Sequence, residues 1–460
     1  MSSNKDLERL LGDPKVAIRS MVGAFLIAFA VVEVNQFVDT FWVSGLGTSS
    51  SAAVSTVVPL YGLMMCAGLG IATGATTSIA YHLGKGERAF AGKLAGNALI
   101  LGAVTAVLSS IVIYVIAEPA LDLMGAGGIM HESMDYLMPY ILLSPALLCE
   151  SIIAGILRGE GAAKKSTLVQ MSAACFNMVI DPVLIYGFGM GVFGAGLATA
   201  ISALLSLILG LSWYRGGRMI VKLNRSCFRP DRAAVHGVME VGGPKSVQTI
   251  ISNMTDLVQR VFLIAAGGTN AVMFYNYAWK YIGLATLPGR AYDSAMIPVC
   301  SAGFGQHDLG KMREGFRYTT RLVVGIGLCL MVFLLVLSEP LMTILTYEES
   351  MAALRPEFVW TLQVAALLVP FSALMGVGAS MLQTMKKAKR AMNFYFLWAV
   401  VKLALYAISA YAFGSYEGII YSMVIVHVFG AVCLMGMARM EFGKLEREFE
   451  QMDKDAQAAS

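Results

Sequence analysis

The sequence predicts an all-helical protein that crosses a membrane many times. Hydrophobic residues make up 57% of its 460 residues and charged residues only 14%. A soluble domain carries about a quarter charged residues, so this chain cannot cover itself with a polar surface. Apolar stretches of about 20 residues, the length that crosses a hydrocarbon core, recur from end to end. About twelve of them begin near residues 17, 52, 95, 137, 167, 193, 245, 271, 318, 358, 392 and 418, and each is expected to be a transmembrane helix.

Lys and Arg alternate between successive links, which predicts the orientation. The N-terminal tail and the links "HLGKGERAFAGK", "LRGEGAAKKS" and "TMKKAKRA" are basic, whereas "SGLGTSSSAAVS" and "GFGMGVFGAG" carry no charge. Because cytoplasmic loops carry the positive excess, both termini are expected in the cytoplasm and the protein in the plasma membrane. Residues 1–15 lack an early apolar region, so we interpret them as an interfacial segment rather than a signal peptide.

The two halves of the chain repeat one another at a spacing of about 221 to 225 residues, the sign of a duplicated unit. "LGKGERAFAGKL" corresponds to "FGQHDLGKMREG", "LRGEGAAKKS" to "LQTMKKAKRA", and Pro145 to Pro370. An even number of spans per unit predicts two six-helix lobes related by a pseudo-twofold axis along the membrane normal. The expected domains are an interfacial segment (1–15), an N-lobe (16–213), a cytoplasmic linker (214–232), a C-lobe (233–440) and a cytoplasmic tail (441–460).

A carboxylate lies inside an apolar span in "FNMVIDPVLIYG", from Phe176 to Gly187. Asn177 and Asp181 are four residues apart and therefore share a helix face. Counted from the nearest span ends, Asp39, Asp181 and Thr199 all lie roughly 10 Å below the outer edge of their helices. Two carboxylates, an amide and a hydroxyl at one depth predict a site for H⁺ or Na⁺.

Each of these residues also has a purely structural interpretation. Asp39 could cap or tether its helix near the interface, and Thr199 could bond back to its own helix. For Asp181 the functional interpretation is favoured, because a mid-span carboxylate costs about 3 kcal/mol on insertion scales.

The motifs "FVDTFWVSGLG", "LRGEG" and "FNMVIDPVLIYG...GAGLATAIS" resemble those of the multidrug and toxic compound extrusion (MATE) family, and the resemblance covers essentially the whole chain. It implies a twelve-helix antiporter that expels organic compounds in exchange for H⁺ or Na⁺. It also implies a cation site at Asp39, Asn177, Asp181 and Thr199. Glu160 in "RGEG" matches a family position near the cytoplasmic side, where a gate or loop tether is expected.

Other polar residues within spans are candidates for a substrate cavity. In the N-lobe these are Glu33, Asn35, Gln36 and Glu150, and in the C-lobe they are Asp256, Arg260, Lys280 and Lys402. Asp256 and Arg260, four residues apart, are expected to pair on one face. The C-lobe charges either neutralise one another or form a cationic wall that suits anionic or zwitterionic amphiphiles. Lys402 falls at the repeat position of Asn177.

The sequence gives no support for an enzyme: HExxH, GxSxG, paired CxxC and P-loop motifs are absent. Without a P-loop we expect no ATP-driven pumping, no cofactor other than the coupling ion, and no nucleic-acid partner. The prediction is a monomeric secondary active exporter that contacts membrane lipids and small organic or amphiphilic substrates. The alternative is a flippase for a lipid-linked, anionic or zwitterionic amphiphile. Either H⁺ or Na⁺ fits the oxygen-only site.

Overall fold

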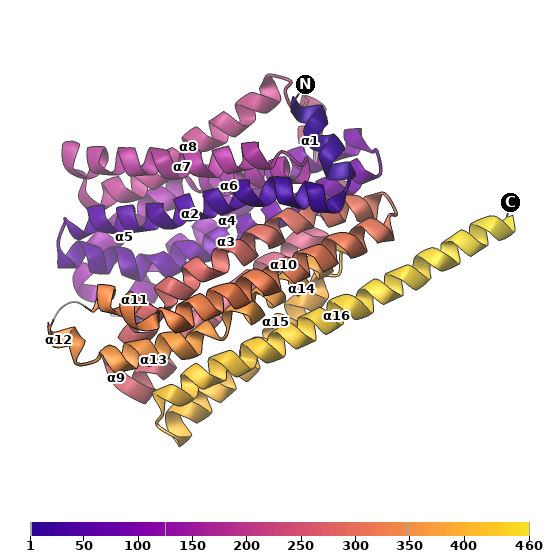
Figure 1. Ribbon diagram of the computed structural model, residues 1–460. Helices are drawn as coiled ribbons and strands as arrows, with labels where there is room; N and C mark the ends of the chain where they lie inside the picture. The colour runs from indigo at the N-terminus through magenta and orange to yellow at the C-terminus, as the bar shows by residue number, and fades with distance from the viewer. Residues whose placement is uncertain (1, 125, 347–348, 460) are drawn as a thin grey trace. The chain divides into compact units, whose positions relative to one another are not determined.

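The computed structural model describes residues 2–124, 126–346 and 349–459, and all regular secondary structure in these ranges is helical (Figure 1). The first half contains α1 (Ser2–Leu11), α2 (Pro14–Ser44), α3 (Thr48–Gly84), α4 (Arg88–Leu123), η1 (Gly127–Ile129), α5 (Met130–Leu142), α6 (Ser144–Gly159), α7 (Ala163–Pro182), the π-helix η2 (Val183–Gly187) and α8 (Gly191–Arg215). After η3 (Arg225–Phe228) follow α9 (Arg232–Gly305), α10 (Leu309–Val336), α11 (Ser338–Leu345), α12 (Glu349–Ala352), α13 (Arg355–Ala366), α14 (Val369–Thr384), α15 (Ala388–Ala407), the π-helix η4 (Ile408–Ala412) and α16 (Tyr416–Ala459).

The helices of the described residues accommodate the twelve predicted spans. Ten helical segments are long and apolar enough to cross a membrane, and the bent pair Gly127–Leu142 and Ser144–Gly159 makes an eleventh. The 74-residue α9 supplies two spans rather than one, because its backbone leaves the helical conformation at Gly267 and Gly268. The prediction of an all-helical, multi-pass membrane protein is confirmed.

The chain forms two compact units, and α9 contributes to both. One unit takes in the chain up to Ile250 together with Ser301–Gln306, and the other takes in Ile251–Cys300 and the chain from His307 onward. The segment expected to link two lobes, 214–232, lies within the first unit.

Glycines allow the helices of the first unit to pack backbone to backbone. A Cβ atom at Gly74 of α3 would lie 2.1 Å from the carbonyl oxygen of Val238, and one at Gly155 of α6 would lie 2.5 Å from that of Ala72. Such small residues permit close helix contact where the lipid supplies no hydrophobic driving force. Gly74 belongs to the glycine-rich run "AGLGIATGATT" of α3, whose small residues allow this close approach.

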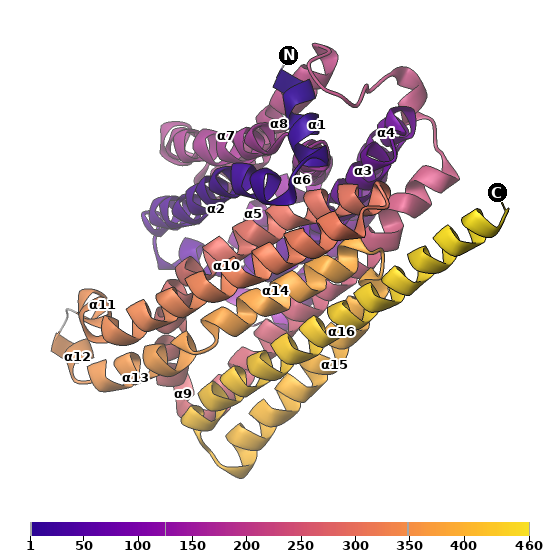
Figure 2. The same ribbon diagram turned by 45° about the vertical axis from the view of Figure 1, so that its right-hand side comes forward.

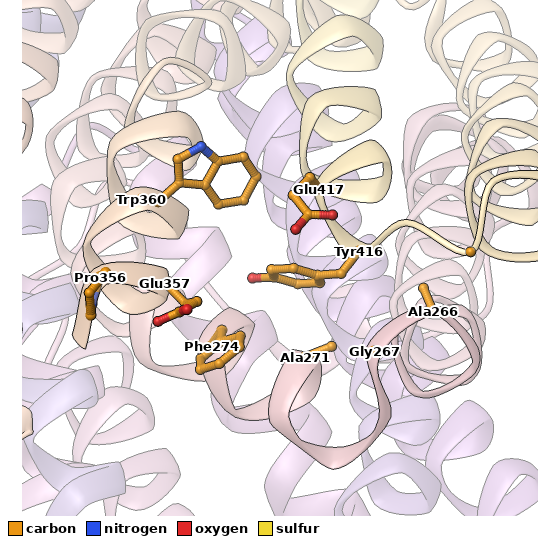
Figure 3. Close-up of a pocket in the computed structure, with 10 residues that line it drawn as sticks. Ala266, Gly267, Ala271, Phe274, Pro356, Glu357, Trp360, Tyr416 and Glu417 are labelled. Carbon is orange, nitrogen blue, oxygen red and sulfur yellow. The ribbon is translucent and has the colours of Figure 1, made fainter. Parts of the chain in front are cut away.

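In the second unit, α16 packs along α14 and α15, as both views show (Figures 1 and 2). The residues around the break in α9, the start of α13 and the start of α16 surround a pocket of about 520 Å³ (Figure 3). Buried aromatic side chains, including Phe274, Phe358 and Tyr416, form the core beside it.

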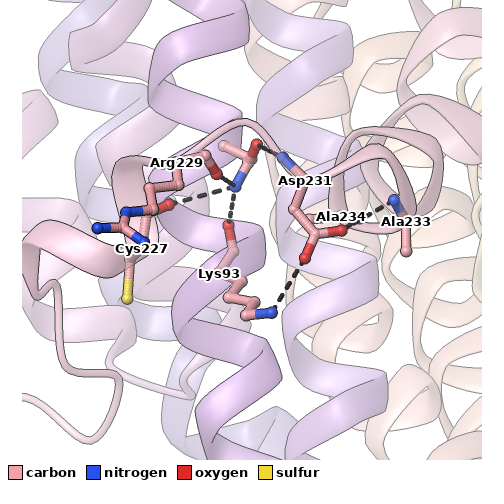
Figure 4. Close-up of polar contacts among 7 residues, drawn as sticks. Lys93, Cys227, Arg229, Asp231, Ala233 and Ala234 are labelled. Carbon is pink, nitrogen blue, oxygen red and sulfur yellow. Dashed lines mark hydrogen bonds and ion pairs between the residues drawn. The ribbon is translucent and has the colours of Figure 1, made fainter.

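The segment between α8 and α9 is fixed to α4 by Asn97, which is 2% exposed. The Asn97 amide nitrogen donates to the carbonyl oxygens of Cys227 (3.2 Å) and Arg229 (3.1 Å), and its oxygen accepts from the Asp231 backbone at 2.9 Å. Lys93, one turn earlier, forms an ion pair of 3.1 Å with the Asp231 carboxylate (Figure 4). Asp231 also caps α9 through the backbone N–H groups of its first turn.

Candidate functional site

Asn177 and Asp181 of α7 form the centre of a polar cluster buried in the first unit. The Asn177 amide nitrogen donates to Asp181 Oδ1 at 2.9 Å and approaches Thr199 Oγ1 of α8 at 3.2 Å. Asp181 is fully buried and Asn177 is 3% exposed. The spacing of four residues thus places both groups on the face of α7 that meets α8.

Asp39 reaches the same cluster from α2, which packs against α7. The carboxyl groups of Asp39 and Asp181 lie within hydrogen-bonding reach of each other. Asp39 Oδ1 and Asp181 Oδ2 are both buried, and neither receives a hydrogen bond from a described residue. Burying such oxygens is costly unless a partner satisfies them, so the arrangement leaves two acceptors available to a shared proton or a bound cation.

The local sequence explains why α7 changes its helical geometry beside Asp181. Pro182 has no N–H group, so it cannot bond to the carbonyl of Met178. The chain continues as the π-helix η2, and the Phe188 N–H reaches back five residues to the Val183 oxygen at 2.9 Å. Single turns of π-helix within longer helices occur frequently at functional sites.

Three tyrosines complete the surroundings of the cluster, and none of them is among the site residues predicted from the sequence. Tyr140 of α5 lies within hydrogen-bonding reach of Thr199 and stacks on Tyr61 of α3, with the ring centroids 4.5 Å apart. Its hydroxyl is also 2.9 Å from that of Tyr136. Tyr136 and Tyr140 are four residues apart in "MDYLMPYIL", and this spacing of polar groups inside a span was the available signal.

The other four N-lobe candidates lie on α2 and α6. Glu33 is partly buried on α2, Asn35 has a buried Oδ1 that accepts no hydrogen bond from the described residues, and Gln36 is exposed. Glu150 lies on α6, where its carboxylate has Arg158 of the same helix as a neighbouring charge. None of the hydrogen bonds described above joins these four residues to the cluster.

In the second unit, Asp256 pairs with Lys402 rather than with Arg260. The Lys402 ammonium lies 3.0 Å from Asp256 Oδ1, and the lysine side chain is 5% exposed while the aspartate side chain is 61% exposed. The ammonium also lies over the rings of Trp398 and Tyr406, at 4.9 and 5.8 Å from their centroids. Lys402 is therefore neutralised by its surroundings.

Lys280 and Arg260 differ from Lys402 because both are exposed. Lys280 lies over the Tyr277 ring at 5.3 Å. Of the two alternatives drawn from the sequence, mutual neutralisation of the C-lobe charges describes the Asp256–Lys402 pair, and a cationic wall at Lys280 and Arg260 stays a prediction.

Glu160 immediately follows α6 and is fully buried. Its carboxylate accepts hydrogen bonds from the Tyr214 hydroxyl (2.5 Å) and from the backbone N–H groups of Ile220 (3.0 Å) and Val221 (3.1 Å). Burial raises the pKa of Glu160 to about 7, against the lowering effect of these three donors. The side chain thus holds the segment that follows α8, and its part in gating stays a prediction.

The oxygen-rich cluster is chemically compatible with a proton or a hard monovalent ion, and its use as a cation site stays a prediction. Its donor set consists of two carboxylates, an amide and a hydroxyl, all oxygen acceptors of the kind that such ions prefer. Within the described residues, groups of three or more His, Cys, Asp or Glu able to hold a metal ion are absent. The donor set therefore differs from those of structural zinc sites, which use Cys and His.

Comparison with known proteins gives a family match over most of the chain. The family model described as MatE matches residues 24–183 and 244–408. The multidrug export protein MepA of Staphylococcus aureus (strain MRSA252) is 23% identical over 392 residues, which is 84% of each chain. MepA of Staphylococcus saprophyticus is 22% identical over 424 residues, or 91% of each chain.

Solved structures share the fold. A multidrug resistance MATE family transporter of the MOP superfamily, in an outward-facing conformation, superimposes with a TM-score of 0.90 at 24% identity, over 96% of this chain and 98% of the other. A MOP superfamily transporter from Pyrococcus furiosus, described as having a binding pocket of reverse polarity, gives a TM-score of 0.88 at 24% identity, over 96% and 99% of the two chains.

Proposed function

This chain belongs to the MatE family, a family of transporters and not of enzymes, and we propose that it exports small organic compounds by secondary active antiport with H⁺ or Na⁺. The observation that carries the proposal is the cluster of Asp39, Asn177, Asp181 and Thr199, with its two unsatisfied carboxylate oxygens. The export names of the similar proteins support the direction of transport.

The coupling follows from what the cluster does to α2, α7 and α8. An ion or proton bound between Asp39 and Asp181 removes the repulsion of two neighbouring carboxylates and draws these helices together. The ion-bound arrangement and the substrate-bound arrangement are then two conformations of the same helices. Each ligand favours its own conformation, so ion entry and substrate exit are exchanged by alternating access.

We propose further that the exporter acts as a monomer in the plasma membrane. Both termini lie in the cytoplasm, because the basic links alternate with neutral or acidic ones. The ion gradient supplies the energy, and neither ATP nor nucleic acid takes part.

An assay in proteoliposomes tests the exporter. Purified protein is reconstituted with a fluorescent dye outside and an imposed H⁺ or Na⁺ gradient, and dye transport is followed before and after an ionophore dissipates that gradient. We expect transport with at least one of the two gradients, and none with Asp181→Asn. Transport that persists after both gradients collapse would refute antiport, and full transport by Asp181→Asn would remove the cluster from the mechanism.

A second candidate, flipping of an anionic or zwitterionic amphiphile, is favoured by the exposed Lys280 and Arg260 of the second unit. Lys280→Ala combined with Arg260→Ala should then abolish the movement of a fluorescent anionic lipid between leaflets while dye export persists. An unchanged rate of lipid movement in the double variant would exclude this activity.

A further inference from the structure

The segment between α8 and α9 carries a positive charge that the chain does not compensate. Residues 215–232, which we call the basic linker, contain six Lys or Arg side chains and one carboxylate. The six basic residues are all exposed: Arg215, Arg218, Lys222, Arg225, Arg229 and Arg232. The carboxylate, Asp231, already pairs with Lys93 and caps α9. Within the described residues, none of the six basic side chains forms an ion pair.

The basic linker is held against the helices of the first unit. A Cβ atom at Gly96 of α4 would overlap the carbonyl group of Cys227, so glycine permits the linker backbone to pack directly on this helix. Asn97 donates to the carbonyl oxygens of Cys227 and Arg229 (Figure 4). The buried Glu160 accepts two further backbone N–H groups of the linker. The basic side chains therefore project from a fixed backbone.

The contact with α4 also sets the depth of the basic linker in the membrane. Residues 98–117 of α4 contain no charged side chain, and their number is about the 20 that cross a hydrocarbon core. Asn97 directly precedes this stretch, so it lies at the boundary between the hydrocarbon and the headgroups. Because Asn97 bonds to the carbonyl oxygens on both sides of Phe228, that phenylalanine lies at the level of the headgroups.

Phe228 is an exposed aromatic residue at this boundary. It is 41% exposed, and Arg225 and Arg229 lie beside it in the sequence. Phenylalanine side chains on membrane-surface segments enter the boundary between headgroups and acyl chains, while basic residues attract anionic lipids. A ring and two arginines at one depth therefore match a phospholipid, which offers a phosphate next to apolar chains.

The positive-inside rule accounts for the sign of this charge but not for its arrangement. A basic link orients a membrane protein without an exposed ring and without a backbone fixed by buried side chains. In the basic link between α14 and α15, Arg390 is paired with Glu441 of α16. That arginine is satisfied within the chain, whereas the arginines beside Phe228 are available to a ligand.

We propose that the basic linker binds an anionic phospholipid, with Arg225 and Arg229 at the phosphate and Phe228 against the acyl chains. Arginine suits this role because its planar guanidinium donates two hydrogen bonds to two phosphate oxygens at once. Each basic side chain near an anionic membrane surface strengthens binding roughly fivefold. The site does not include the cluster around Asp181, so it does not rest on the export mechanism.

Phosphatidylglycerol and phosphatidylcholine with the same acyl chains are matched probes, because the first is anionic and the second has no net charge. Full-length protein is equilibrated with equal amounts of both, and the lipids that stay bound are counted by native mass spectrometry. We expect the wild type to prefer phosphatidylglycerol by about tenfold or more, and Arg225→Gln with Arg229→Gln to reduce that preference by about fivefold or more. Lys5→Gln with Arg88→Gln removes equal charge from exposed positions of α1 and α4 and should leave the preference intact.

Asn97→Ala distinguishes a built site from diffuse attraction to charge. This variant keeps all six basic residues but frees the backbone on both sides of Phe228, so the preference should fall by about threefold or more. An undiminished preference in Asn97→Ala, or in the double Gln variant, would overturn the proposal. Asp181→Asn should retain the preference, so failure of the export mechanism and failure of the lipid site are distinguishable.

A second measurement leaves all charges in place. Phe228→Trp adds a fluorophore, and the fluorescence gained over the wild type is followed in bilayers of equal phosphatidylglycerol and phosphatidylcholine, only one of which has brominated chains. We expect stronger quenching when phosphatidylglycerol is brominated. Equal quenching by both lipids, or none by either, would overturn the proposal. Soluble glycerol 3-phosphate should not change the difference, and its loss would assign the site to free phosphate instead of a lipid.

Discussion

The two units contain π-helices at equivalent positions but place different residues beside them. Val183–Gly187 and Ile408–Ala412 begin 225 residues apart, and each is followed by a glycine with positive φ, Gly189 and Gly414. At the same spacing, Asn177 and Asp181 of the first unit correspond to Lys402 and Tyr406 of the second.

This difference teaches how a duplicated site can be filled from within the chain. In the first unit, Asp39 and Asp181 keep two carboxylate oxygens without hydrogen-bond donors. In the second unit, the Lys402 ammonium is held 3.0 Å from Asp256. The Lys402 ammonium is a permanent positive charge beside a carboxylate, whereas the first unit would take its positive charge from solution as a proton or a cation. Only the first unit is therefore expected to exchange a coupling ion.

Moving the lysine into the first unit should have the largest effect. Asn177→Lys places an ammonium beside Asp181, where it would act as a resident cation and reduce coupled export by about 10- to 100-fold. Dye export in proteoliposomes measures this, with Lys402→Asn as the reciprocal variant that should keep most of its activity. Normal export by Asn177→Lys would contradict the inference that a lysine takes the place of the coupling ion.

The ion pair of the second unit should respond unequally to the loss of either partner. Asp256→Asn leaves the Lys402 ammonium, which is 5% exposed, without its counter-charge and should lower the free energy of unfolding by about 1–3 kcal/mol. Lys402→Met should cost less than about 1 kcal/mol, because the freed carboxylate is largely exposed and methionine fills the space. Unfolding of both variants in mixed micelles checks the order, and equal costs would contradict it.

Glu160 should make the stability of the first unit depend on pH. Because burial raises its pKa to about 7, from 4.5, the folded state retains the proton that the unfolded state has lost. The resulting stabilisation is complete below about pH 4.5 and is lost as pH rises through about 7, by about 1–3 kcal/mol. Thermal unfolding between these limits measures it.

The decrease in stability with rising pH that is attributed to Glu160 should vanish in Glu160→Gln. Glu8→Gln, which removes an exposed carboxylate of α1 in the same unit, should leave it intact. A slope that persists in Glu160→Gln would assign the pH dependence to another group.

The smallest effect concerns the starts of two helices of the first unit, α2 and α9. Asp13 caps α2 as Asp231 caps α9, but only Asp231 is further tied to α4 through Asn97 and Lys93. Asn97→Ala should cost about 1–2 kcal/mol and expose residues 216–231 to protease, because the Cys227 and Arg229 carbonyls lose their donor. Asn270→Ala, at an exposed position, serves as the control.

The sequence predicts the fold well because each determinant is local. The length of each apolar stretch predicts a transmembrane span, and the matching charged links of the two halves predict the duplicated unit. The grouping of Asp39, Asn177, Asp181 and Thr199 also follows from helical rise and spacing. Helical spacing predicts that Asp256 pairs with Arg260, yet it pairs with Lys402, 146 residues away. The spacing of Tyr136 and Tyr140 is a local signal, but the stacking of Tyr61 on Tyr140 depends on tertiary packing, which no local pattern encodes.

Counting the ions bound by purified protein tests the central claim most directly. Binding of radioactive sodium and uptake of protons are measured on the wild type, on Asp181→Asn and on Lys402→Met. We predict that one ion species binds at one site per chain, that Asp181→Asn abolishes this site, and that Lys402→Met retains it. Ion binding that survives in Asp181→Asn, or that disappears in Lys402→Met, would contradict the assignment of coupling to the first unit.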